Sequence, residues 1–120
     1  MKRVLLFDDS ELTLRVARAA LEAAGFEVLA VADGNHLAAG IRQHPDLILL
    51  DVHMPELFGD DLVEFLREEW GVRAPIHLFS SLDENGLSER AREAGADGWI
   101  SKNRGVDALV DRVTELLARH

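Results

Sequence analysis

Short apolar runs alternate with amphipathic segments along the whole chain. The runs are rich in Val, Ile, Leu and Phe and are bounded by polar residues, Gly or Pro, as is typical of strands buried in a sheet. They cover residues 3–8, 26–31, 46–50, 75–80 and 98–101. Between them, apolar residues recur at helical spacing, which predicts helices over residues 11–24, 35–43, 60–70, 87–94 and 106–117.

Strand and helix therefore alternate five times, which favours an α/β fold with a parallel sheet covered by helices on both faces. Right-handed crossovers leave few ways to connect such a sheet. We expect a flavodoxin-like (βα)5 doubly wound sheet with strand order 2-1-3-4-5. The chain shows no linker, repeat or low-complexity tract, so we expect one domain over residues 1–120.

The composition of the chain argues against several classes of function. The net charge of −9 and the pI near 4.9 argue against direct binding to nucleic acid or to an anionic membrane. No apolar run is long enough to span a bilayer or to act as a signal peptide. There is no cysteine, which agrees with a reducing cytoplasm, and we expect a cytoplasmic protein.

Polar side chains that could bind a ligand or take part in catalysis lie at the ends of four of the five predicted strands. Asp8 and Asp9 come after the first strand, Asp51 ends the third, Ser80 ends the fourth and Lys102 follows the fifth. Carboxyl ends of parallel strands lie on one edge of a sheet, and ligands bind at that edge. In the expected strand order the first and third strands are neighbours, so the three carboxylates should lie close together.

Three clustered carboxylates would repel one another unless a cation lies between them. Mg²⁺ suits a site of carboxylate oxygens that keeps room for water and a phosphate oxygen, and Mn²⁺ is an alternative. A carboxylate can act as a covalent nucleophile toward a phosphoryl group. The constellation therefore predicts aspartyl-phosphate formation, with Lys102 and the Ser80 hydroxyl contacting phosphoryl oxygens.

With these residues in this order, the chain resembles the receiver domain of two-component response regulators over essentially its whole length. The matching motifs are Asp8-Asp9, Asp51 followed by Met54-Pro55 and Gly59, Ser80, and Gly95-Ala96-Asp97-Gly98 leading to Lys102. Each motif alone is weak, but together, in this order and spacing, they are highly specific.

The resemblance implies a role for each matching position. Asp51 would be the phosphoacceptor, and Asp8, Asp9, Asp51 and the backbone carbonyl of His53 would hold Mg²⁺. Lys102 would contact the phosphoryl group, while Ser80 and the aromatic Trp99 would form the switch. The donor would be a phosphohistidine on a sensor kinase or phosphotransfer protein. The domain would assist its own phosphotransfer and dephosphorylation without being a conventional enzyme.

The resemblance also implies how the signal leaves the site. Phosphorylation would alter the face formed by the fourth helix, fifth strand and fifth helix, which would then contact a downstream protein. The chain ends just after its last predicted helix, so we expect no output domain within it. It would act either alone or as one part of a longer protein.

Three positions depart from the family pattern. Trp99 stands where Tyr or Phe is usual, and Ser81 replaces a common Ala beside the phosphate. Asn103 replaces the Pro that normally follows the lysine after a cis peptide bond. A cis bond before Asn costs about 3 kcal/mol relative to trans, so either the loop bears that strain or its path differs.

Other functions remain as alternatives. A pseudo-receiver would keep the fold and bind partners without phosphorylation. An FMN protein needs a Ser-, Thr- or Gly-rich phosphate loop where this chain has Asp8-Asp9-Ser10-Glu11, and a haloacid-dehalogenase-type phosphatase needs an Asp-x-Asp arrangement. A zinc site has no supporting ligand spacing among His36, His44, His53 and His77. We expect His77 to be a core histidine with satisfied hydrogen bonds, and the His53 side chain to influence acyl-phosphate hydrolysis or to be solvated.

Overall fold

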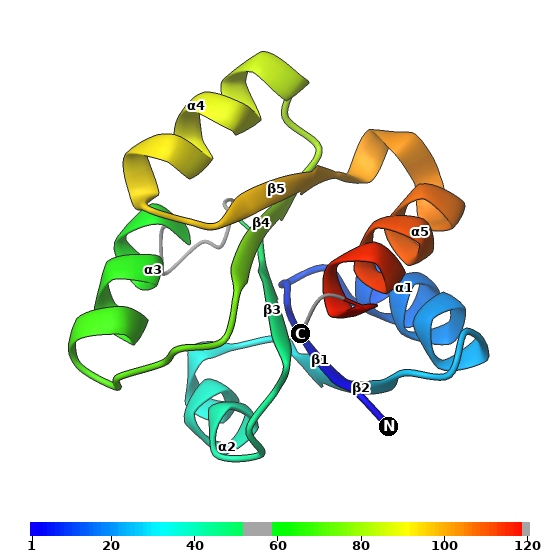
Figure 1. Ribbon diagram of the computed structural model, residues 1–120, viewed down its shortest axis with the longest axis horizontal. Helices are drawn as coiled ribbons and strands as arrows, with labels where there is room; N and C mark the ends of the chain where they lie inside the picture. Colours follow the sequence, from blue (N-terminus) through cyan, green and yellow to red (C-terminus); the bar gives the residue numbers. More distant parts are fainter. Residues whose placement is uncertain (52–58, 119–120) are drawn as a thin grey trace.

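The computed structural model describes residues 1–51 and 59–118, and its centre is a five-stranded parallel sheet (Figure 1). The strand order is β2-β1-β3-β4-β5, as the sequence predicts. The strands are β1 (Arg3–Phe7), β2 (Glu27–Val31), β3 (Leu47–Leu50), β4 (Ile76–Ser80) and β5 (Gly98–Ser101). All carboxyl ends of the strands therefore lie on one edge of the sheet.

Helices cover both faces of the sheet. The helices are α1 (Glu11–Ala23), α2 (Leu37–Ile41), α3 (Gly59–Glu68), α4 (Glu84–Ala94) and α5 (Gly105–Ala118), with 3-10 turns η1 (Gly34–His36) and η2 (Lys102–Arg104). Helices α1 and α5 lie side by side on one face, and α2, α3 and α4 cover the other (Figure 1). No helix in the described ranges is both long and apolar enough to cross a bilayer.

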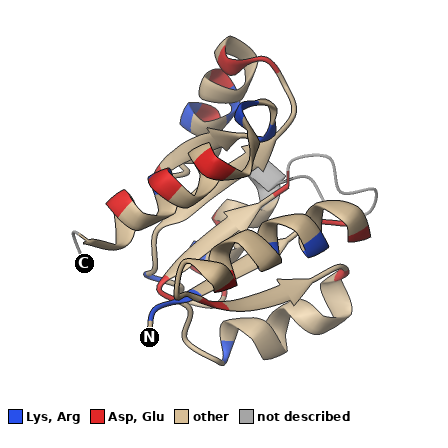
Figure 2. Ribbon diagram, turned by 90° about the vertical axis from the view of Figure 1, so that its right-hand side faces the viewer, with Lys and Arg blue, Asp and Glu red and all other residues tan. Residues whose placement is uncertain are grey.

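Alternate residues of each strand supply the two halves of the core. In β1, Leu5 and Phe7 face α2, α3 and α4, whereas Val4 and Leu6 face α1 and α5. All four are at most 1% exposed. Charged positions lie mostly on the helices and at the strand ends (Figure 2). The continuous apolar runs of the sequence are therefore explained by a sheet that is covered on both sides.

The predicted element types are confirmed, but several helix ends differ. Helix α4 begins at Glu84 and not at residue 87, because the Asp83 side chain accepts a hydrogen bond from Gly86 N at 2.8 Å and caps the helix. Gly86 obscured this start in the sequence, since glycine is a poor helix former. Helix α3 ends at Glu68, two residues before the predicted end, and α2 is shorter than predicted.

Asp97 fastens the start of β5 to the start of β4. One carboxylate oxygen accepts hydrogen bonds from Ile76 N at 2.8 Å and from Arg67 at 2.6 Å. Arg67 in turn donates to the carbonyls of Val72 and Ala74. The aspartate of the Gly95-Ala96-Asp97-Gly98 motif therefore has a structural role in the sheet.

Replacing Asp97 with Ala is expected to destabilise the domain by about 1–3 kcal/mol, because Ile76 N and the Arg67 guanidinium lose their acceptor. Urea unfolding followed by circular dichroism measures this effect. The exposed residue Asp111, for which the described part of the chain shows no ion pair, provides the control Asp111→Ala. Equal stability of the two variants would contradict the role of Asp97.

His77 lies on the α5 face of β4 and is 2% exposed. It pairs in register with Gly98, and a Cβ at position 98 would come within 2.7 Å of His77 Nε2. Glycine at 98 therefore makes room for the imidazole. The prediction of a fully satisfied histidine is wrong, because Nδ1 has no hydrogen-bond partner among the described residues. Burial, and secondarily the positive charge of Arg112, lower the pKa of His77 to about 4, while Asp97 opposes this shift.

Candidate functional site

Backbone hydrogen bonds of the sheet fix two carboxylates at its carboxyl edge. Asp8 follows β1, and its N–H donates to Val31 O at 3.1 Å. Asp51 follows β3, and its N–H donates to Phe7 O at 2.9 Å. Both residues continue the ladder by one step, so their side chains leave the sheet where strands β1 and β3 lie next to each other.

Asp8, Asp9 and Asp51 form one acidic cluster. Their nearest ligand oxygens lie within 4.8 Å of one another, and no other such group of three potential ligands occurs among the described residues. Asp8 and Asp51 are only 2% and 4% exposed, whereas Asp9 is open to solvent. The sequence-based prediction that these three residues lie together thus agrees with the structure.

The Asp8 carboxylate suits a metal ligand. Its Oδ1 accepts a hydrogen bond from Ser10 N at 2.9 Å, at the start of α1. Its Oδ2 is buried and has no aligned hydrogen-bond donor among the described residues, although the Lys102 ammonium lies 2.6 Å away. The contact with Lys102 is therefore an ion pair, and a metal ion at Oδ2 would share this oxygen with the ammonium. Mg²⁺ prefers such carboxylate oxygens.

Lys102 reaches two of the three carboxylates. Its Nζ lies 2.6 Å from Asp8 Oδ2 and 3.7 Å from Asp51 Oδ2. The same Nζ lies over the ring of the buried Phe79, 5.3 Å from its centroid. No peptide bond in the described residues is cis, so Asn103 follows Lys102 through a trans bond at the start of η2. The loop therefore does not bear the strain of a cis bond before Asn103, and Lys102 points into the acidic cluster.

The Ser80 hydroxyl lies at the carboxyl end of β4 and is completely buried. Ser80 pairs in register with Ser101, the last residue of β5. Its Oγ accepts a hydrogen bond from Leu82 N at 3.2 Å. The hydroxyl is therefore engaged in the turn between β4 and α4.

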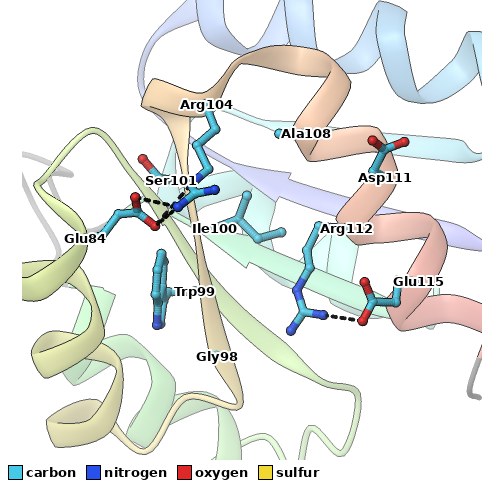
Figure 3. Close-up of a pocket in the computed structure, with 10 residues that line it drawn as sticks. All are labelled: Glu84, Gly98, Trp99, Ile100, Ser101, Arg104, Ala108, Asp111, Arg112 and Glu115. Atoms are coloured by element: carbon cyan, nitrogen blue, oxygen red, sulfur yellow. Dashed lines mark hydrogen bonds and ion pairs between the residues drawn. The ribbon is translucent and has the colours of Figure 1, made fainter.

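Trp99 lies half-buried on β5 and packs against the core beneath α2, α3 and α4. It also lines a groove of about 510 Å³ between α4 and α5, together with Glu84 and Arg104 (Figure 3). Trp99 is thus placed between the core and the face formed by α4, β5 and α5.

The environment of one predicted metal ligand is not described, and one contact of the site was not predicted. His53 and Met54-Pro55 lie outside the described residues, so the proposed backbone ligand from His53 stays a prediction. One contact is not predicted from the sequence: Asn103 Nδ2 donates a hydrogen bond to Ser81 O at 2.9 Å. The sequence feature that points to this contact is the asparagine at position 103, because its side-chain amide can donate a hydrogen bond and the side chain of proline cannot.

Comparison with known proteins agrees with this geometry. The family model of the response regulator receiver domain matches residues 4–114. The polar-differentiation response regulator DivK of Brucella ovis is 30% identical over 118 residues, which cover 97% of this chain and 96% of DivK.

Solved structures give the same result. The chemotaxis protein CheY4 of Vibrio cholerae superposes with a TM-score of 0.84 at 27% identity, covering 96% of this chain and 98% of CheY4. The Francisella response regulator 1452 receiver domain superposes with a TM-score of 0.85 at 27% identity, covering 99% and 98% of the two chains. With its fold, its acidic cluster and its sequence in agreement, the chain belongs to the response regulator receiver domain family.

Proposed function

We propose that Asp51 of this chain accepts a phosphoryl group from a phosphohistidine on a sensor kinase or phosphotransfer protein. The observation that supports this most is the acidic cluster of Asp8, Asp9 and Asp51 with the Lys102 ammonium beside it. Receiver domains interact with histidine kinases or phosphotransfer proteins and with downstream targets. For this chain, we propose a phosphohistidine as the donor and Asp51 as the acceptor.

The transfer step needs one nucleophile and several positive partners. An Asp51 carboxylate oxygen forms a bond to phosphorus while the bond between phosphorus and the donor nitrogen breaks, and the imidazole keeps that electron pair. Charge on the phosphoryl oxygens is largest in the transition state. Lys102 Nζ lies 3.7 Å from Asp51 Oδ2 and would contact one of these oxygens, and the Ser80 hydroxyl would contact another after leaving Leu82 N.

Asp8, Asp9 and Asp51 would hold the Mg²⁺ ion, or Mn²⁺ in its place. When bound, the cation would offset the negative charge of the acidic cluster and of the phosphoryl oxygens. Asp8 would exchange part of its contact with Lys102 for the cation. That exchange would leave the ammonium available to the phosphoryl group.

The phosphorylated domain would signal through the face of α4, β5 and α5. Ser80 ends β4 directly before the loop that leads to α4, and Trp99 connects the core to the groove between α4 and α5. A charge change at Asp51 can therefore bias the loop and the face together. Residues 1–120 would act as a single receiver domain, and the acyl phosphate would later be hydrolysed at the same site.

Incubation with acetyl phosphate and Mg²⁺ tests the proposal without a known kinase. The expected result is a mass gain of one phosphoryl group, which disappears when the cation is chelated with EDTA. Because acyl phosphates react with hydroxylamine, the label should also be lost on hydroxylamine treatment. The absence of a mass gain with either Mg²⁺ or Mn²⁺ would contradict the proposal. It would favour a pseudo-receiver that binds its partners without being phosphorylated.

A further inference from the structure

The peptide group between Ser81 and Leu82 is held from both sides. Its N–H donates to Ser80 Oγ at 3.2 Å, and its carbonyl accepts from Asn103 Nδ2 at 2.9 Å. A peptide group is planar, so its N–H and C=O directions are fixed relative to each other. Fixing the carbonyl of this group therefore also aims its N–H at the Ser80 hydroxyl.

Asn103 is itself held in place. Its backbone N–H donates to Ser101 Oγ at 3.1 Å, at the start of η2. The next residue, Arg104, forms a two-pronged ion pair with the Glu84 carboxylate, with both oxygens 2.7 Å from one guanidinium nitrogen (Figure 3). Glu84 opens α4, so the η2 turn contacts the segment from Ser81 to Glu84 at both ends.

We propose that Asn103 is a positioning residue that keeps the Ser80 hydroxyl in its resting turn and so opposes the phosphorylated arrangement. The inference rests on the proposed function, in which Ser80 contacts a phosphoryl oxygen. In the proposed switch, Oγ moves toward the phosphoryl group and gives up the Leu82 N–H, and the peptide group 81–82, having lost that acceptor, shifts with the loop. That movement stretches or breaks the hydrogen bond from Asn103, which is satisfied in the resting arrangement.

The direction of the effect follows from the equilibrium between the two arrangements. A contact made in only one of two states stabilises that state. Removing the Asn103 amide therefore favours the phosphorylated arrangement and any ligand that selects it. The same change leaves the carboxylates of the acidic cluster in place, so binding of Mg²⁺ alone should not change.

Beryllofluoride in the presence of Mg²⁺ is a suitable probe, because it mimics a phosphoryl group on a carboxylate. Calorimetry should show that Asn103→Ala binds it about threefold to tenfold more tightly than the native chain, the size expected for one hydrogen bond. Asn103→Leu, which keeps a similar volume without a donor, should behave alike. Hydrogen exchange of the Leu82 amide should become faster in both variants.

Arg92→Ala is the matched control, because Arg92 forms an exposed ion pair with Glu89 on α4, away from η2. It should leave beryllofluoride affinity unchanged. Unchanged or weaker binding by both Asn103 variants would overturn the inference. If the native chain itself failed to bind beryllofluoride with Mg²⁺, the proposed function would fail instead, so the two failures are distinguishable.

Discussion

Replacing Asp51 with Asn is expected to abolish phosphoryl transfer while leaving the domain folded. An amide oxygen is a much poorer nucleophile than a carboxylate, and loss of a covalent nucleophile costs about 10³-fold or more in rate. The backbone hydrogen bond from residue 51 to Phe7 O does not depend on the side chain and remains. Lys102 keeps its contact with Asp8 at 2.6 Å. Intact-mass analysis after incubation with acetyl phosphate and Mg²⁺ measures the loss.

A matched control separates the nucleophile from a general change in charge. Asp111→Asn removes the same charge from an exposed position on α5 and should be phosphorylated like the native chain. The melting temperature of Asp51→Asn without Mg²⁺ should not fall, since one of three clustered carboxylates is gone. Persistent labelling of Asp51→Asn would place the phosphoacceptor elsewhere and contradict the proposal.

The site could be predicted because its residues follow from the topology. Once five apolar runs are assigned to a parallel sheet, the polar residue after each run must lie on the same edge. Asp8 and Asp51 are adjacent because β1 and β3 exchange backbone hydrogen bonds, and the strand order alone implies that pairing. Lys102 needs only the length of its side chain to reach them from the end of β5.

Features that depend on side-chain direction could not be predicted. Asn103 departs from the proline of the family pattern, but nothing in the sequence indicates that its amide donates to Ser81 O in the loop after β4. Helix α4 begins at Glu84 because the Asp83 side chain accepts a hydrogen bond from Gly86 N. The low helix propensity of Gly86 instead favours a later start for the helix. The sequence likewise does not show that Nδ1 of His77 lacks a hydrogen-bond partner among the described residues, on a face of the sheet whose core is apolar.

His77 is expected to make the stability of the domain depend on pH in the mildly acidic range. Its pKa is about 4 in the folded chain and 6.5 as the reference value, so the unfolded state binds the proton more readily. The stability that comes from neutral His77 is therefore complete above about pH 6.5 and is lost as the pH falls toward 4. The difference between the two pKa values corresponds to roughly 3 kcal/mol. Urea unfolding at several pH values measures the slope.

His77→Leu should remove most of this slope, because leucine has a similar volume and carries no titrating group. At neutral pH the variant should be as stable as the native chain or more so, since it loses a buried Nδ1 that has no hydrogen-bond partner in the part of the chain that the structure describes. His36→Gln, which changes an exposed histidine, should leave most of the slope in place. Carboxylates that titrate in the same range contribute equally to the native chain and to His77→Leu, so the difference between their curves isolates the imidazole. If the free energy of unfolding of the native chain and of His77→Leu changed with pH in the same way, His77 would be protonated as readily in the folded chain as in the unfolded one. That result would contradict the prediction.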